Sequence, residues 1–208
     1  MTTMVRYGCW SILALAAAVA LGACGSVRYP AHYVLEVAPA PPAAALPPSA
    51  LGPLVVRELA CSPYLCEGRV VYREEPHRVG FYDYHRWALN PRTALTRVLA
   101  DRIRASSLFE SVTVAGSPAQ TAYLLRGEIE RFEEVDRKTS VHAICTISAE
   151  IVDVKTGRAI WRGIDSDTVP VQQRDVPGVV VGLGVASRTV ADRLVASIAT
   201  QLAVNRSP

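Results

Sequence analysis

A period-2 alternation over residues 141–154 constrains the fold of this chain more than any other feature. One face is apolar and consists of Val141, Ala143, Cys145, Ile147, Ala149 and Ile151. The other face carries the polar residues His142, Thr146, Ser148 and Glu150. Successive side chains point to opposite faces in a β-strand, so the pattern predicts a long strand with one buried face. A sheet that covers a core on one side is therefore the expected centre of the fold.

The segments that flank this strand predict an antiparallel sheet. Lys155-Thr156-Gly157 is typical of a hairpin turn, because Gly157 accepts a positive φ. Residues 158–168 then return as the partner strand, and residues 123–134 precede it as a third strand. Three consecutive strands connected in this way favour antiparallel pairing.

Shorter strands and two helices complete the predicted domain. Strands are expected at residues 54–59, 69–74 and 79–84. A helix begins at Asn90 and Pro91, because asparagine caps helix N-termini and proline suits the first helical position. Its apolar face consists of Leu95, Val98, Leu99 and Ile103. A last helix follows Pro177, with an apolar face of Leu183, Ala186, Val190, Leu194, Ile198 and Leu202.

The N-terminus predicts a secreted lipoprotein. Arg6 precedes an apolar run over residues 10–21, which is shorter than the roughly 20 residues that span a bilayer. The run ends in Leu21-Gly22-Ala23-Cys24, which resembles a bacterial lipobox. We therefore predict a signal peptide at residues 1–23 and lipidation of Cys24, with palmitate among the attached acyl chains. Gly25 favours the outer membrane, facing the periplasm, by resemblance to the lipoprotein sorting rule.

The predicted domain organisation follows from these segments. Residues 24–53 form the lipidated N-terminus, which contains a short strand near Tyr33 and a proline-rich stretch at residues 39–53. That stretch is an insertion if the short strand joins the sheet, and otherwise a tether. Residues 54–208 form the folded domain. The predicted fold class is α+β: two layers, with a mostly antiparallel sheet packed against two helices, after a cleaved signal peptide.

Charge and cysteine content narrow the function further. The 22 Lys and Arg against 19 Asp and Glu give a net charge of +3, too small for a nucleic-acid binder. Cys61 and Cys66 flank a proline-containing turn, and an oxidising periplasm favours a disulfide between them over two unpaired thiols. Cys145 lies on the apolar strand face and is expected in the core.

Catalytic and cofactor signals are weak. Gly182-Leu183-Gly184 lacks the third glycine of a dinucleotide loop and is interpreted as a flexible or close-packed helix start. The four histidines show no spacing typical of metal ligands. The sequence therefore predicts no catalytic residue, no metal, no cofactor and no enzymatic activity.

An aromatic segment at residues 81–87, with the sequence Phe-Tyr-Asp-Tyr-His-Arg-Trp, is the most informative remaining motif. Aromatic residues with arginine are typical anchors of protein interfaces. The alternative is a core strand whose rings pack beneath the first helix. We predict Phe81 and Trp87 in the core, and a partner-binding surface formed by Tyr82, Tyr84, His85 and Arg86.

This segment resembles the family of ABC-type transport auxiliary lipoproteins, which includes a lipoprotein associated with paraquat-inducible MCE proteins. The resemblance rests on residues 63–65, 69–73, 82–88, 108–112 and 125–129. It implies a non-enzymatic component of an ABC/MCE system that moves phospholipids or other hydrophobic molecules. The implied partners are an MCE-domain protein and the transporter permease and ATPase, with the lipoprotein docking the assembly at the outer membrane.

Two other functions compete with this interpretation. One is a pilotin-like or assembly lipoprotein for another outer-membrane complex, and the other is a periplasmic hydrolase. The hydrolase would require a clustered polar pocket. The residues do not decide whether the chain also associates with itself as a homo-oligomer.

Overall fold

The computed structural model describes residues 28–40, 50–114, 121–137 and 139–204. The predicted signal peptide, Cys24 and Gly25, and residues 41–49 of the proline-rich stretch lie outside these residues.

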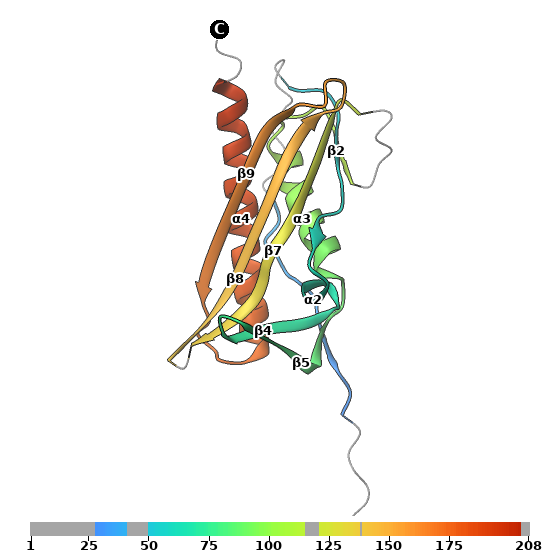
Figure 1. Cartoon of the computed structure of the whole chain (residues 1–208). Coiled ribbons are helices and arrows are strands. Elements are labelled where there is room, and N and C mark those ends of the chain that lie inside the picture. The colour runs from blue at the N-terminus through green and yellow to red at the C-terminus, as the bar shows by residue number, and fades with distance from the viewer. Residues whose placement is uncertain (1–27, 41–49, 115–120, 138, 205–208) are drawn as a thin grey trace, which may run out of the picture.

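Three long strands form the centre of the sheet, as the alternation predicted. They are β7 (Tyr123–Arg137), β8 (Ser140–Asp153) and β9 (Ala159–Pro170), and each pairs antiparallel with the next. The turn between β8 and β9 contains Gly157 at φ +69°, the left-handed conformation expected there. These strands lie side by side in Figure 1.

Short strands join the other edge of β7 in parallel and make the sheet mixed. They are β2 (Leu54–Val56), β3 (Ala60–Cys61) and β4 (Arg69–Glu75), and β6 (Val112–Val114) pairs parallel with β2. β5 (Arg78–Trp87) pairs antiparallel with β4, and β1 (Ala31–Tyr33) pairs parallel with β5. Within the described ranges the sheet has nine strands, and the long ladders are antiparallel.

The two predicted helices pack on one face of this sheet (Figure 1). They are α3 (Pro91–Ala105) and α4 (Val176–Val204), and the short helix α2 (Pro63–Cys66) precedes β4. The Asn90 side chain accepts a hydrogen bond from the Arg92 amide, so it caps α3 as predicted. The α+β fold class is thus confirmed. Among the helices in the described ranges, none is long and apolar enough to cross a membrane.

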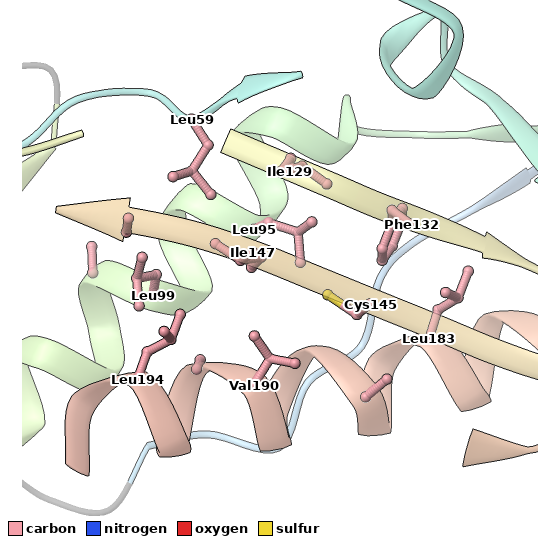
Figure 2. Close-up of a cluster of buried hydrophobic side chains, with 14 of the residues drawn as sticks. Leu59, Leu95, Leu99, Ile129, Phe132, Cys145, Ile147, Leu183, Val190 and Leu194 are labelled. Carbon is pink, nitrogen blue, oxygen red and sulfur yellow. The ribbon is translucent and has the colours of Figure 1, made fainter. Parts of the chain in front are cut away.

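The core lies between the sheet and the two helices (Figure 2). The apolar face of β8 and the apolar stripe of α4 both contribute to it, and Cys145 is buried there as an unpaired thiol. Burial raises the pKa of this thiol to about 12, so it stays protonated and packs as a small apolar group. Trp87 is buried as predicted, whereas Phe81 is only partly buried.

The chain preceding the proline-rich stretch belongs to the folded unit. β1 joins the sheet through β5, ahead of the proline-rich stretch in the chain. Residues 34–39, which we call the strap, continue from β1 and run against α4. A boundary drawn at residue 54 would therefore separate a strand from its own sheet.

Two close approaches explain the Gly182-Leu183-Gly184 motif. A Cβ atom at position 182 would lie 2.8 Å from the Cβ of Ala143 on β8, and one at position 184 would overlap the Glu36 carbonyl oxygen of the strap. Both glycines lie inside α4, so the motif is the close-packed helix segment that the sequence favoured. Gly184 thus lets the strap lie directly against the helix.

Arg102 ties the strap to both helices. This residue of α3 is only 7% exposed, and its Nη2 donates to the Ala38 carbonyl oxygen at 2.5 Å. Its Nε lies 3.3 Å from Asp192 of α4. A buried guanidinium needs such partners, because an unpaired buried charge is strongly unfavourable.

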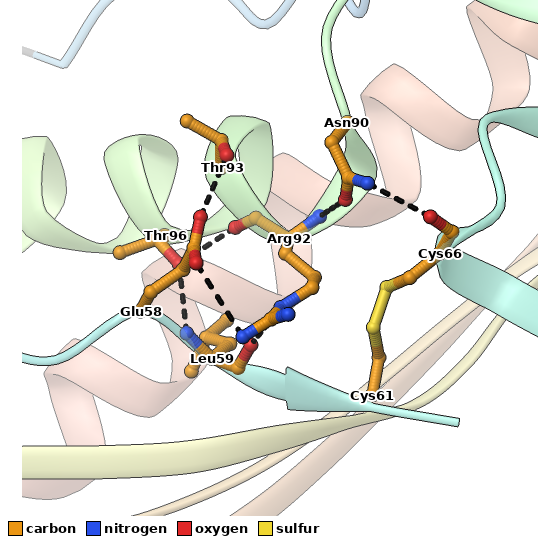
Figure 3. Close-up of a disulfide and its surroundings, with 8 residues drawn as sticks. All are labelled: Glu58, Leu59, Cys61, Cys66, Asn90, Arg92, Thr93 and Thr96. Carbon is orange, nitrogen blue, oxygen red and sulfur yellow. Dashed lines mark hydrogen bonds and ion pairs between the residues drawn. A yellow bond between two sulfur atoms is a disulfide. The ribbon is translucent and has the colours of Figure 1, made fainter. Parts of the chain in front are cut away.

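A disulfide joins Cys61 of β3 to Cys66 of α2, with the two Cα atoms 6.4 Å apart (Figure 3). This is the pairing that the sequence favoured. The Asn90 side chain, which caps α3, also donates to the Cys66 carbonyl oxygen at 2.8 Å. Arg92 of α3 donates to the Leu59 carbonyl oxygen at 3.0 Å. The bridge therefore holds the turn against which the N-terminus of α3 is positioned.

Candidate functional site

The aromatic segment leaves the regular strand ladder. Val71 of β4 pairs with Phe81, and Arg69 pairs with Arg86. One residue of β4 therefore lies opposite four residues of β5, Tyr82 to His85. Such an irregularity redirects side chains that a regular strand would send to fixed faces. It explains why these four residues gather at one end of the molecule.

Tyr82 is half-buried rather than on the surface, because its hydroxyl bonds to an acid on β7. Its Oη donates to Glu134 Oε2 at 2.8 Å. Its ring centroid lies 4.9 Å from that of Tyr72 and 5.6 Å from that of His85. His85 is held in turn by Tyr33 of β1, whose hydroxyl lies 2.8 Å from His85 Nδ1. The cluster therefore joins strands β1, β4, β5 and β7.

Tyr84 remains at the surface and is 44% exposed. The Arg28 guanidinium lies 5.5 Å from the centroid of its ring, which is within the range of a cation–π interaction. Arg28 precedes β1, so this contact places Tyr84 beside the segment that leads into that strand.

A pocket of about 380 Å³, which we call the β5 pocket, opens on this cluster. Its lining combines aromatic and acidic side chains: Tyr72, Glu74, Phe81, Tyr82, Asp83, Tyr84, His85, Glu134 and Asp136. Three of the four predicted partner-binding residues, Tyr82, Tyr84 and His85, thus line one pocket, and Arg86 does not.

Burial is the largest influence on the pKa values of Tyr82 and Glu134, which are hydrogen-bonded to each other. It raises the pKa of Tyr82, and the hydrogen bond to Glu134 raises it further. Burial also raises the pKa of Glu134, while the hydrogen bond from Tyr82 acts in the opposite direction. The tyrosine is therefore a permanent donor, and the carboxylate is its acceptor.

The pocket presents aromatic rings, His85 and four carboxylates. Its lining holds no serine, cysteine, threonine or lysine. In the part of the chain that the structure describes, no three His, Cys, Asp or Glu side chains converge as metal ligands would. Aromatic faces and separated carboxylates are instead suited to a large, diffuse cation.

Several residues of the site were not predicted from the sequence. Glu134 and Asp136 come from β7 and Tyr72 from β4, far from the aromatic segment along the chain. The adjacent pair Glu133-Glu134 between Phe132 and Val135 was the available signal, because two acids in an apolar strand require partners. Only the tertiary structure shows those partners, which are Arg73 of β4 for Glu133 and Tyr82 of β5 for Glu134.

Comparison with solved structures shows that this fold is shared. The protein XCC0632 from Xanthomonas campestris is 18% identical, and the match covers 84% of this chain and 99% of that chain with a TM-score of 0.71. An uncharacterised protein is 17% identical over 84% of this chain and 99% of its own, with a TM-score of 0.60. No curated protein matches the chain.

Residues 33–196 match the family described as the ABC-type transport auxiliary lipoprotein component. The chain belongs to this family, as its sequence resemblance predicted. Its members are lipoproteins of the cell envelope that accompany a transport system. The matched range begins in β1 and ends within α4, so it includes the whole β5 pocket.

Proposed function

We propose that this protein is a non-enzymatic accessory lipoprotein of an ABC/MCE-type transport system for phospholipids or other hydrophobic molecules. Lipid on Cys24 anchors it in the outer membrane, and the domain faces the periplasm. There it docks the MCE-domain protein, which the permease and ATPase serve from the inner membrane. Family membership and the lipobox support this assignment.

The contact of Arg28 with Tyr84 carries the proposal. Three residues lie between Cys24 and Arg28, and even a fully extended chain over these four residue steps spans only about 14 Å. A lipid on Cys24 therefore keeps Tyr84 and its pocket close to the membrane surface. An anchored surface raises the effective concentration of a weak contact, so a modest interface suffices for docking.

In-cell photo-cross-linking tests this function. A photoreactive amino acid at Tyr84 is expected to capture the MCE-domain protein, whereas one at exposed Glu130 on β7 is not. The Cys24→Ser variant is expected to leave the membrane fraction and lose most of the cross-link. Capture of a secretin or another assembly protein instead would favour the pilotin-like alternative, and no specific capture would contradict docking at this surface.

A further inference from the structure

The β5 pocket carries negative charge that its own chain leaves partly unpaired. Four of its lining residues are acidic, and Arg and Lys are absent from the lining. Glu74 pairs with Arg78 and Asp136 with Arg174, both in solvent-exposed pairs. Glu134 and Asp83 form no ion pair with any residue that the structure describes. The pocket therefore attracts cations on a chain whose net charge is positive.

Glu134 presents one free carboxylate oxygen to this pocket. The side chain is 95% buried, and Tyr82 donates to Oε2. Oε1 accepts no hydrogen bond from the described residues, yet no buried side-chain polar atom among them lacks a partner. Oε1 therefore reaches solvent, and it does so in the pocket that Glu134 lines. A nearly buried carboxylate with one open oxygen is a strong acceptor for a charged donor.

The aromatic walls show which kind of cation fits. The Arg69 guanidinium lies 4.0 Å from the centroid of Phe81, and Arg28 lies over Tyr84. Two rings of the pocket thus already take a guanidinium group of this chain. The carboxylates do not converge as they would around a metal ion. A planar cation with apolar faces and several N–H donors satisfies both the rings and the open oxygen.

From these contacts we infer that the β5 pocket is a receptor for an arginine side chain presented by the docking partner. The guanidinium lies against Tyr82 and against the face of the Tyr84 ring that Arg28 leaves open, and it donates to Glu134 Oε1, with Asp83 at the exposed rim. The identity of the protein that supplies this arginine rests on the proposed function. The ability of the pocket to bind a guanidinium group does not. Glu134 would thereby gain an ion pair, which no described residue of its own chain forms with it.

Fluorine NMR on the full lipidated chain in detergent micelles, labelled with 3-fluorotyrosine, tests this inference. N-acetyl-arginine methylamide is the probe, and the citrulline analogue is its neutral match. We expect saturable shifts of the Tyr82 and Tyr84 resonances with arginine and none with citrulline. Tyr82→Phe and Tyr84→Phe assign these resonances. Equal shifts with both probes would overturn the inference.

Variants separate the pocket from general charge effects. Glu134→Gln keeps an oxygen for the Tyr82 hydrogen bond and should weaken arginine binding at least tenfold. Asp83→Asn, at an exposed position, should weaken it severalfold. Glu150→Gln is the matched control, because Arg126 and Arg162 already hold that carboxylate, and its binding should equal that of the wild type. Unchanged binding in both pocket variants would refute the inference.

A further arm distinguishes the source of the cation. Phosphocholine presents a quaternary ammonium without N–H donors, so it should bind more weakly than arginine. Saturation by phosphocholine in place of arginine would overturn the assignment to a protein side chain. Arginine binding without cross-linking to the MCE protein would leave the pocket standing and refute the proposed partner. If the Glu134→Gln variant still cross-links to the MCE protein, the proposed partner stands and the docking of its arginine in the pocket is refuted.

Discussion

Glu133 and Glu134 are adjacent on β7, but their carboxylates lie in different surroundings. Glu133 is fully buried, and its two oxygens accept from Arg73 Nε and Nη2, each at 3.0 Å. Arg131 adds a third donor at 2.8 Å. Glu134 points to the other face and receives only the Tyr82 hydroxyl. Successive residues of a strand face opposite sides, so one carboxylate becomes structural and the other faces a pocket.

Removal of Arg73 should destabilise the protein strongly. Arg73→Met takes away the bidentate partner of a carboxylate with 0% exposure and leaves it only the part-exposed Arg131, so breaking this buried pair should cost about 3 kcal/mol. Urea unfolding followed by circular dichroism measures the change. The control is Arg162→Met, whose partner Glu150 retains Arg126 at the surface, with an expected loss below about 1 kcal/mol. Equal losses in both variants would contradict a structural role for Glu133.

Glu134 should make stability depend on pH in the direction set by its raised pKa. A carboxyl whose folded pKa exceeds its unfolded value contributes stability below about pH 4, and that contribution is lost as pH rises through the folded pKa. Relative to the wild type, Glu134→Gln should therefore become more stable between pH 4 and pH 7.

Glu150 provides a control of opposite sign. Hydrogen bonds from Arg162 and Arg126 lower its pKa, so its contribution is present above about pH 4 and is lost as pH falls. Relative to the wild type, Glu150→Gln should become less stable as pH rises from 3 to 7. Denaturant unfolding of both variants over this range measures the two trends. Parallel trends would show that burial does not control Glu134.

At the scale of elements, the disulfide connects β3 and α2 to the start of α3. Closing so short a loop stabilises the folded state by about 2 kcal/mol. The Asn90 bridge from the Arg92 amide to the Cys66 carbonyl then transmits the position of this turn to the helix. The bridge therefore acts on the helix terminus as well as on its own loop.

Reduction of the disulfide should loosen the N-terminal turn of α3 first. Amide hydrogen exchange is expected to rise at Arg92 and Thr93 before it rises in β7, and the free energy of unfolding should fall by about 2 kcal/mol. The double variant Cys61→Ser/Cys66→Ser should show the same loss and no further response to reductant. An equal increase of exchange across β7 would contradict a local effect.

The long elements could be predicted from the sequence with their period, whereas β3 and β6 were not predicted and β2 was expected only as part of a longer strand at residues 54–59. β7, β8, β9, α3 and α4 are long enough for a period of 2 or 3.6 residues to repeat several times. β3 has two residues, and β2 and β6 have three, so no period can be observed in them. Parallel pairing with β7 defines β2 and β3, and β6 pairs with β2 in turn, so all three depend on residues distant in sequence.

At the scale of the whole molecule, the strap couples the N-terminal segment to the helical layer. Gly184 gives it room on α4, and Arg102 holds the Ala38 carbonyl oxygen between α3 and α4. A pull on the N-terminus would therefore reach both helices as well as β1. This arrangement suits a domain that is held at a membrane through its N-terminus.

Gly184→Ala should release the strap. A Cβ atom there overlaps the Glu36 carbonyl oxygen, so overpacking should cost about 1–3 kcal/mol although alanine favours helix by about 1 kcal/mol. Hydrogen exchange should increase over residues 34–39. The exposed variant Thr200→Ala, far along the same helix, should leave exchange in the strap unchanged. Unaltered exchange in Gly184→Ala would contradict the close contact.

The sequence by itself determined the α+β class, the long antiparallel ladders, the cap at Asn90 and the family. These features rest on local periodicity, capping chemistry and short motifs, which neighbouring residues encode. Only the tertiary structure decided that β1 belongs to the sheet, that the strap crosses α4, and that Glu134 and Tyr72 meet Tyr82. These contacts join residues that lie far apart in the chain, and the physical reason is packing. The close approach at Gly184 and the pairing of buried charges depend on where whole elements lie, which no local pattern records.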